Sequence, residues 1–255
     1  MSNRTYGTTP AVPGGAVALS ALFVAALVTA QVTAAKVLAF EIPVGLPVTG
    51  STLVLPGAAL AYALTFLASD CYAELYGKRA AQVLVNVGFL LNFLVLALVW
   101  STILAPAAPN SVDPAAFETV LGASTNIVAG SLLAYVVSQN YDVVVFHRLA
   151  DMTDGRQLWL RNVVSTGTSQ AIDTVIFVGV AFWLLPRYVT ATDPLPASII
   201  ASLMIGQYLL KLLIALVDTP FVYAVVGLVR SRADAAAKAA AAASAGDRES
   251  PPDEF

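Results

Sequence analysis

The chain is poor in charge, cysteine and histidine. Only 11% of its 255 residues are charged, against about 25% in a typical soluble domain, so it is not an ordinary soluble globular protein. The single cysteine, Cys71, excludes an internal disulfide, and with one histidine, His147, no group of Cys and His has the spacing of a metal site. A net charge of -3 provides no basic surface for a phosphate backbone, so we expect no nucleic-acid partner.

Common catalytic motifs are missing as well. The sequence contains no Walker A pattern, no G-x-S-x-G elbow and no H-E-x-x-H helix. We therefore expect a protein that is not an enzyme and needs no cofactor. The alternatives from another class are a structural bundle or an intramembrane enzyme, which would have to pair two of the carboxylates Asp70, Asp142 and Asp173.

Hydrophobic residues make up 58% of the chain and gather in six stretches. Each is long enough for a membrane helix, which needs about 20 mostly apolar residues. The first stretch is far longer than the apolar region of a signal peptide, so we expect it to be retained. The sequence predicts an all-α polytopic membrane protein, a bundle of six transmembrane helices over residues 16–40, 53–76, 80–104, 119–147, 160–186 and 197–230.

This pattern divides the chain into a cytoplasmic N-terminal segment (1–15), a transmembrane transporter domain (16–230) and an Ala-rich tail (231–255). The composition of the tail cannot build a core, so we expect a short helix followed by a largely disordered end.

The basic residues predict the orientation in the membrane, because loops rich in Lys and Arg stay on the cytoplasmic side. Of the basic residues outside the membrane, only Arg187 falls on the side opposite the cytoplasm. Lys36 and Lys211 fall inside predicted helices. We therefore expect a multi-pass protein of the cell membrane with both termini in the cytoplasm. The residues on the cytoplasmic side are Arg4, Lys78, Arg79, Arg148, Arg156, Arg161, Arg230, Arg232, Lys238 and Arg248.

Polar side chains recur inside the predicted helices, where they are costly and usually face a partner or a wet cavity. Asp70 and Glu74 are four residues apart and share a helix face, and a polar residue occupies every fourth position from Arg161 to Asp173. The residues that we expect to contact a substrate are Asp70, Glu74, Asn140, Asp142, Arg161, Asn162, Gln170, Asp173, Gln207 and Lys211.

These residues also have structural interpretations. Small hydroxyl residues pack helices together in membranes, and Asp70 and Glu74 could pair with Lys78 and Arg79. Polar stripes on five helices nevertheless predict a shared hydrated or ligand-filled cavity. The stripes mix charges of both signs with amides, whereas an ion channel would use rings of one charge sign. The mixture therefore favours binding of a small, hydrogen-bonding organic solute.

Several strings in the chain resemble the queuosine precursor transporter family, one of the vitamin uptake transporters, which are grouped with the substrate-binding subunits of energy-coupling-factor systems. The resemblance covers about residues 30–223. It rests on DCYAELYGKRA at 70–80, SQNYD at 138–142, LRNVVSTGTSQAIDT at 160–174 with Phe177, and Gln207-Tyr208, Lys211 and Thr219-Pro220 further on.

The resemblance implies six helices and the uptake of 7-deazaguanine compounds, such as 7-cyano- or 7-aminomethyl-7-deazaguanine, for salvage into queuosine or archaeosine in tRNA. A carboxylate can accept hydrogen bonds from the adjacent N–H donors of such a base, while Arg, Asn, Gln or Lys can donate to its acceptors. The residues that could stack on the flat ring are Tyr72, Tyr135, Phe177 and Tyr208.

The driving force has two possible sources. Asp70, Glu74 or Asp173 could bind and release a proton during transport. Alternatively, the chain could be an energy-coupling-factor-type subunit for another vitamin-like solute, driven by a separate ATPase. Besides the lipid bilayer and its small-molecule substrate, the chain could associate with further copies of itself as a homo-oligomer.

Overall fold

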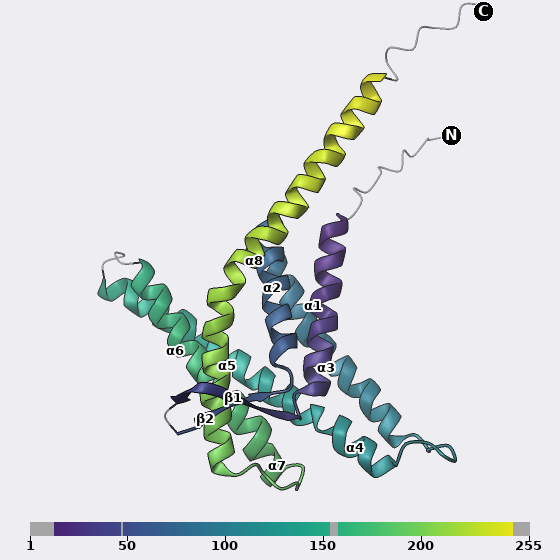
Figure 1. Ribbon diagram of the computed structural model, residues 1–255, viewed down its shortest axis with the longest axis vertical. Helices are drawn as coiled ribbons and strands as arrows, with labels where there is room; N and C mark the ends of the chain where they lie inside the picture. Colours follow the sequence, from purple (N-terminus) through teal and green to yellow (C-terminus); the bar gives the residue numbers. More distant parts are fainter. Residues whose placement is uncertain (1–12, 47, 154–157, 247–255) are drawn as a thin grey trace, which may run out of the picture.

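The fold is seen in a computed structural model that describes residues 13–46, 48–153 and 158–246. Figure 1 shows a helical protein with one small β-hairpin. In chain order the elements are α1 (Gly14–Thr33), β1 (Val37–Leu46), β2 (Gly50–Pro56), α2 (Ala59–Tyr76), α3 (Lys78–Leu104), α4 (Pro114–Gly122), α5 (Ser124–Met152), α6 (Leu158–Gly179), the π-helical turn η1 (Val180–Leu184), α7 (Leu185–Tyr188) and α8 (Ala197–Gly246).

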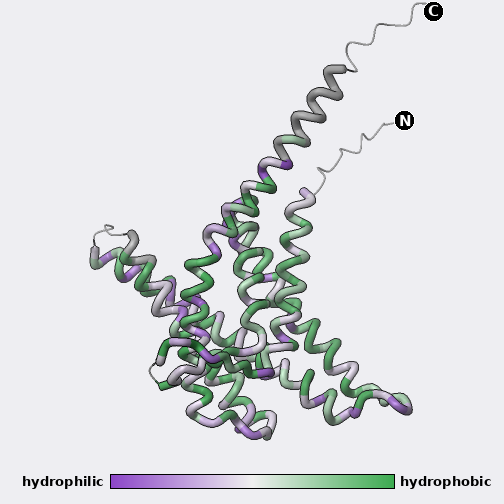
Figure 2. The backbone as a smooth tube through the Cα atoms, in the orientation of Figure 1, coloured by the Kyte–Doolittle hydropathy of each residue, from purple (hydrophilic) through white to green (hydrophobic). Residues whose placement is uncertain are grey.

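Five helical segments of the described chain are long and apolar enough to cross a membrane: Gly14–Thr33, Lys78–Leu104, Pro114–Met152, Val163–Tyr188 and Ala197–Arg232. Helix α2 is not among them, because Asp70 and Glu74 lower the hydropathy of its 18 residues. Large apolar side chains such as Leu60 and Leu216 are about four-fifths exposed, and hydrophobic colour runs along the outer helices in Figure 2. Apolar surface of this extent fits contact with lipid, and the prediction of an all-α polytopic membrane protein is confirmed.

The connection between the first two helices differs from the prediction. Residues that we expected at the end of one helix and the start of the next form the hairpin β1–β2, paired antiparallel from Val37↔Pro56 to Glu41↔Thr52. Pro43, which lies in β1, disfavours a helix over this stretch, since proline removes an intrahelical hydrogen bond and clashes with the preceding turn. Lys36 therefore lies in the turn after α1 and not inside a helix, which corrects the prediction.

Two glycines bring the hairpin close to the helices. A Cβ atom on Gly206 of α8 would lie 2.1 Å from the carbonyl oxygen of Val54, and one on Gly57 would lie 2.4 Å from that of Thr33 at the end of α1. Neither position has room for a side chain, so the base of the hairpin is held between α1 and α8.

Two other predicted spans are subdivided. The fourth comprises α4 and α5, which meet at Ala123, and the fifth comprises α6, η1 and α7 in succession. Helix α8 continues as far as Gly246, into the stretch after residue 230 where we expected a short helix followed by a largely disordered end. Residues 247–255 lie outside the described chain. The N-terminal end of α1 and the C-terminal end of α8 lie toward one end of the molecule (Figure 1). The hairpin and α7 lie toward the other end.

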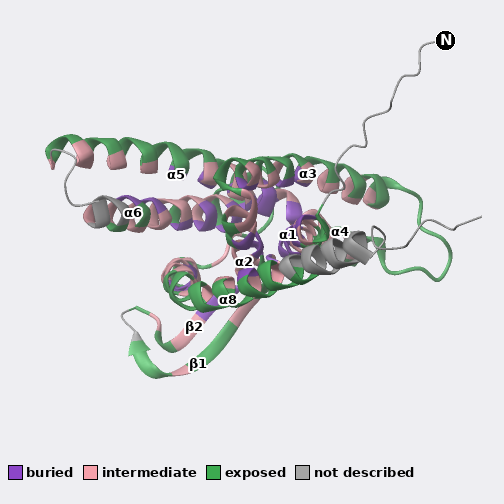
Figure 3. Ribbon diagram, turned by 90° about the horizontal axis from the view of Figure 1, so that it is seen from above, coloured by how far each residue is buried: buried purple, intermediate pink, exposed green. Residues whose placement is uncertain are grey.

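The core forms where the helices cross below the long arm of α8. Residues coloured as buried gather at the centre of the bundle in Figure 3, around α1 and α2. Helices α5 and α6 run side by side in the same view. Small residues permit close packing here: a Cβ on Gly130 of α5 would lie 2.9 Å from the Cβ of Ala181 in η1 and 3.2 Å from the carbonyl oxygen of Phe177 in α6. The larger buried residues of the core include Phe177, Phe182, Ile127 and Leu203.

Candidate substrate cavity

A cavity of about 310 Å³ opens between α1, α2, α3, α5, α6 and α8. Its size falls in the range of small-molecule sites, about 300–1,000 Å³. Its wall includes six aromatic residues, Phe23, Tyr62, Phe66, Phe89, Tyr135 and Phe177, and one glutamine from each of five helices, Gln31, Gln82, Gln139, Gln170 and Gln207. Flat rings and amides that both donate and accept hydrogen bonds suit a planar, polar ligand.

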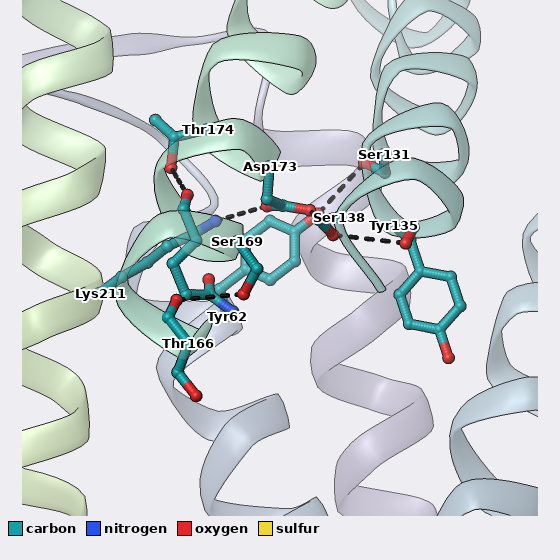
Figure 4. Close-up of polar contacts among 10 residues, drawn as sticks. Tyr62, Ser131, Tyr135, Ser138, Thr166, Ser169, Asp173, Thr174 and Lys211 are labelled. Carbon is teal, nitrogen blue, oxygen red and sulfur yellow. Dashed lines mark hydrogen bonds and ion pairs between the residues drawn. The ribbon is translucent and has the colours of Figure 1, made fainter. Parts of the chain in front are cut away.

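One ion pair supplies the charge in this wall. Lys211 Nζ of α8 lies 2.5 Å from Asp173 Oδ2 of α6, and the side chains are only 13% and 23% exposed. Ser138 of α5 donates a hydrogen bond of 3.2 Å to Asp173 Oδ1. Three helices thus converge on one carboxylate, as Figure 4 shows. Asp173 and Lys211 are the only charged residues in the described lining, so its formal charge is zero.

Hydrogen bonds also orient the aromatic part of the wall. The hydroxyls of Tyr62 and Ser131 lie 3.3 Å apart, joining α2 to α5. Gln82 Nε2 donates to the hydroxyl of Tyr135 at 3.0 Å, and the ring centroids of Tyr135 and Phe89 are 4.2 Å apart. The rings are therefore held in place before a ligand enters.

The predicted substrate residues separate into two groups. Gln170, Asp173, Gln207 and Lys211 line the cavity together. The helical spacing of these polar residues on α6 and α8 was the signal that identified them.

Four other predicted residues whose side chains the structure describes, Asp70, Glu74, Asn140 and Asp142, do not line the cavity. The carboxyl of Asp70 lies near that of Asp218 on α8, and Glu74 forms an exposed ion pair of 3.1 Å with Arg230. The Asn140 amide donates to the carbonyl oxygen of Val136, and Asp142 accepts from Ser169. The side chains of Arg161 and Asn162 lie outside the described part of the structure.

The predicted stacking residues separate in the same way. Tyr135 and Phe177 face the cavity. Tyr72 packs on Tyr76 with ring centroids 4.8 Å apart, and the hydroxyl of Tyr208 donates to the carbonyl oxygen of Gly167. Gln31 and Ser138 line the cavity although neither was among the predicted substrate residues.

Comparison with known proteins adds a family and three relatives. Residues 56–225 match the family model described as putative vitamin uptake transporter. The chain is 34% identical over 164 residues to the probable queuosine precursor transporter of Bacillus subtilis (strain 168), an alignment covering 64% of this chain and 68% of that protein. It is 27% identical over 168 residues to the probable queuosine precursor transporter of Haemophilus influenzae, covering 66% of each chain.

A third relative, the queuosine precursor transporter of Escherichia coli (strain K12), is 26% identical over 159 residues, which cover 62% of this chain and 66% of that protein. No solved structure matches the chain.

Proposed function

The chain belongs to the putative vitamin uptake transporter family, and on this premise we propose that it carries a queuosine precursor, a 7-deazaguanine base, across a membrane. The observation that supports this proposal best is the Asp173 carboxylate, which Lys211 and Ser138 hold at the cavity wall. A guanine-like base presents adjacent N–H donors on one edge, and a carboxylate can accept from two of them at once.

The rest of the cavity fits the other features of such a base. Lys211 can donate to the ring carbonyl next to those N–H groups, and Gln170 can donate to or accept from a ring nitrogen. Phe177 and Tyr135 provide flat apolar faces for the ring system. Ligand binding would then exchange part of the Lys211–Asp173 contact for contacts to the base, without leaving either charge unpaired.

Uptake of labelled 7-deazaguanine bases into cells that cannot synthesise them tests the proposal. We expect uptake with the unmodified chain and at least tenfold less with Asp173→Asn at equal membrane abundance. The amide replaces one acceptor oxygen by an NH2 donor, so it cannot accept from two adjacent N–H groups side by side as the carboxylate does. Glu118→Gln, which neutralises an exposed carboxylate on α4, is the matched control and should leave uptake unchanged. If the inserted, unmodified protein takes up none of these bases, the substrate class is wrong.

The driving force forms a second part of the proposal. We expect an intramembrane carboxylate, Asp173, Asp70 or Glu74, to bind and release a proton in each cycle. If uptake by Asp70→Asn or Glu74→Gln remains as sensitive to an uncoupler as that of the unmodified chain, the replaced residue is not the coupling group. Co-purification of a stoichiometric P-loop ATPase would instead support the energy-coupling-factor alternative.

A further inference from the structure

Two glutamines in the cavity wall carry buried amide atoms that have no hydrogen-bond partner within the described part of the chain. Gln31 of α1 is 1% exposed, and neither its Nε2 nor its Oε1 atom has a partner. Gln207 of α8 is 7% exposed, and its Oε1 is also unpaired. Because a buried polar group without a partner costs free energy, nearly all such groups in folded proteins are paired. Both side chains line the cavity, so a bound molecule can supply the missing partners.

The backbone around the two glutamines is fixed by the hairpin. Gln31 lies in the last turn of α1, two residues before Thr33, where Gly57 makes its close approach. Gln207 directly follows Gly206, which meets the backbone of Val54. Because the hairpin holds both helices at these points, the two amides cannot easily leave the wall to find partners elsewhere.

We propose that Gln31 and Gln207 are ligand-binding residues, which recognise an edge of the base other than the one facing Asp173. An amide presents a donor and an acceptor side by side, the pattern needed to pair with a ring nitrogen and an adjacent exocyclic group of a heteroaromatic base. This proposal rests on the proposed function, because it takes the ligand to be a 7-deazaguanine base. Gln31 lies outside residues 56–225 that match the family model, so the site extends to the first helix.

The chain offers a matched control for this role. Asn92 of α3 is also 1% exposed with both amide atoms unpaired, but it is not among the residues that line the cavity. Replacing either amide by leucine removes a buried unpaired group, so both Gln31→Leu and Asn92→Leu should leave the melting temperature of the empty protein unchanged or raise it. Only Gln31→Leu removes contacts that the ligand would make.

The experiment measures binding of 7-cyano- and 7-aminomethyl-7-deazaguanine to the purified full-length protein, together with its melting temperature. We expect Gln31→Leu to raise Kd by about tenfold or more, the effect of losing two neutral hydrogen bonds, and Asn92→Leu to change Kd by less than about twofold. If Gln31→Leu does not fold, Gln31→Met gives the same test with a side chain of similar length, and Gln207→Met gives it for the second amide.

The outcomes separate the two proposals. Equal Kd values for the unmodified protein and the Gln31 variant would overturn the role of Gln31 while leaving the substrate class intact. An equal loss of affinity in the Gln31 and Asn92 variants would overturn it too, because it would mean that buried amides act only through the fold. If the unmodified protein binds neither base, the proposed function itself fails.

Discussion

Neutralising one partner of the Asp173–Lys211 pair should lower the stability of the fold as well as ligand affinity. Removing one member of a fully buried ion pair costs about 3–5 kcal/mol, because the other charge stays behind uncompensated. The two side chains here are 13% and 23% exposed, so partial solvation of the remaining charge should reduce the cost to about 2–3 kcal/mol. Asp173→Asn and Lys211→Met should each lose this amount.

The double variant Asp173→Asn/Lys211→Met separates stability from recognition. It leaves no unpaired charge, so its melting temperature should recover most of the loss seen in the single variants. Its ligand affinity should not recover, since the anion that accepts from the base is absent. Losing two charge-assisted hydrogen bonds should raise Kd by about a hundredfold or more.

The assays are thermal unfolding of the purified protein and equilibrium binding of a 7-deazaguanine base, run on the same four proteins. Two results would refute the reasoning. A double variant less stable than both single variants would mean that the pair is not the main interaction between these side chains. Unchanged affinity in Asp173→Asn would remove this carboxylate from substrate recognition.

Three further outcomes follow from the structure. Gly206→Ala should lower the free energy of unfolding by about 1–3 kcal/mol, because its Cβ would collide with the Val54 carbonyl oxygen; Gly227→Ala, in the same helix with nothing within 4 Å, should be neutral or slightly stabilising in the same melting assay. Glu74→Gln should lower the free energy of unfolding by less than about 1 kcal/mol, since Glu74 and Arg230 are both more than half exposed. Chemical denaturation measures this free energy, and a larger loss would contradict the prediction. A reporter domain fused to either end of the chain should be found on the cytoplasmic side of the membrane. A reporter on the opposite side would contradict the orientation derived from the basic residues.

The helices could be predicted from the sequence because hydropathy measures how strongly side chains prefer an apolar environment, which is the main requirement for a membrane-spanning segment. A long apolar segment in a membrane must satisfy its backbone internally, and the helix does so. The third predicted span, 80–104, accordingly falls within α3. The hairpin could not be predicted in the same way. Hydropathy does not distinguish a short apolar strand from a short apolar stretch of helix. Pro43 and Pro47 were visible in the sequence, but proline marks an interruption and not the structure that fills it.

Part of the cavity could also be predicted, where the polar residues repeat with the helical period. Asp173 was identified in this way on α6, and Lys211 on α8. Periodicity assigns a residue to a helix face without saying what that face meets. Asp142 has the spacing of a cavity residue on α5, yet its carboxylate accepts a hydrogen bond from Ser169 and lies away from the cavity. Which stripes converge depends on the rotation of each helix, and that rotation is set by close contacts such as Gly130 against Ala181.

Gln31 shows what only three-dimensional structure can add. In the sequence it lies between Thr29 and Thr33, whose hydroxyls bond to the carbonyl oxygens four residues back, Ala25 and Thr29 respectively. A threonine can satisfy its own hydroxyl within its helix in this way, so a buried threonine requires no further partner. The longer amide of Gln31 makes no such bond, and the hairpin keeps α1 in place around it. A molecule bound in the cavity can supply the partners that this amide lacks, as the role proposed for Gln31 requires.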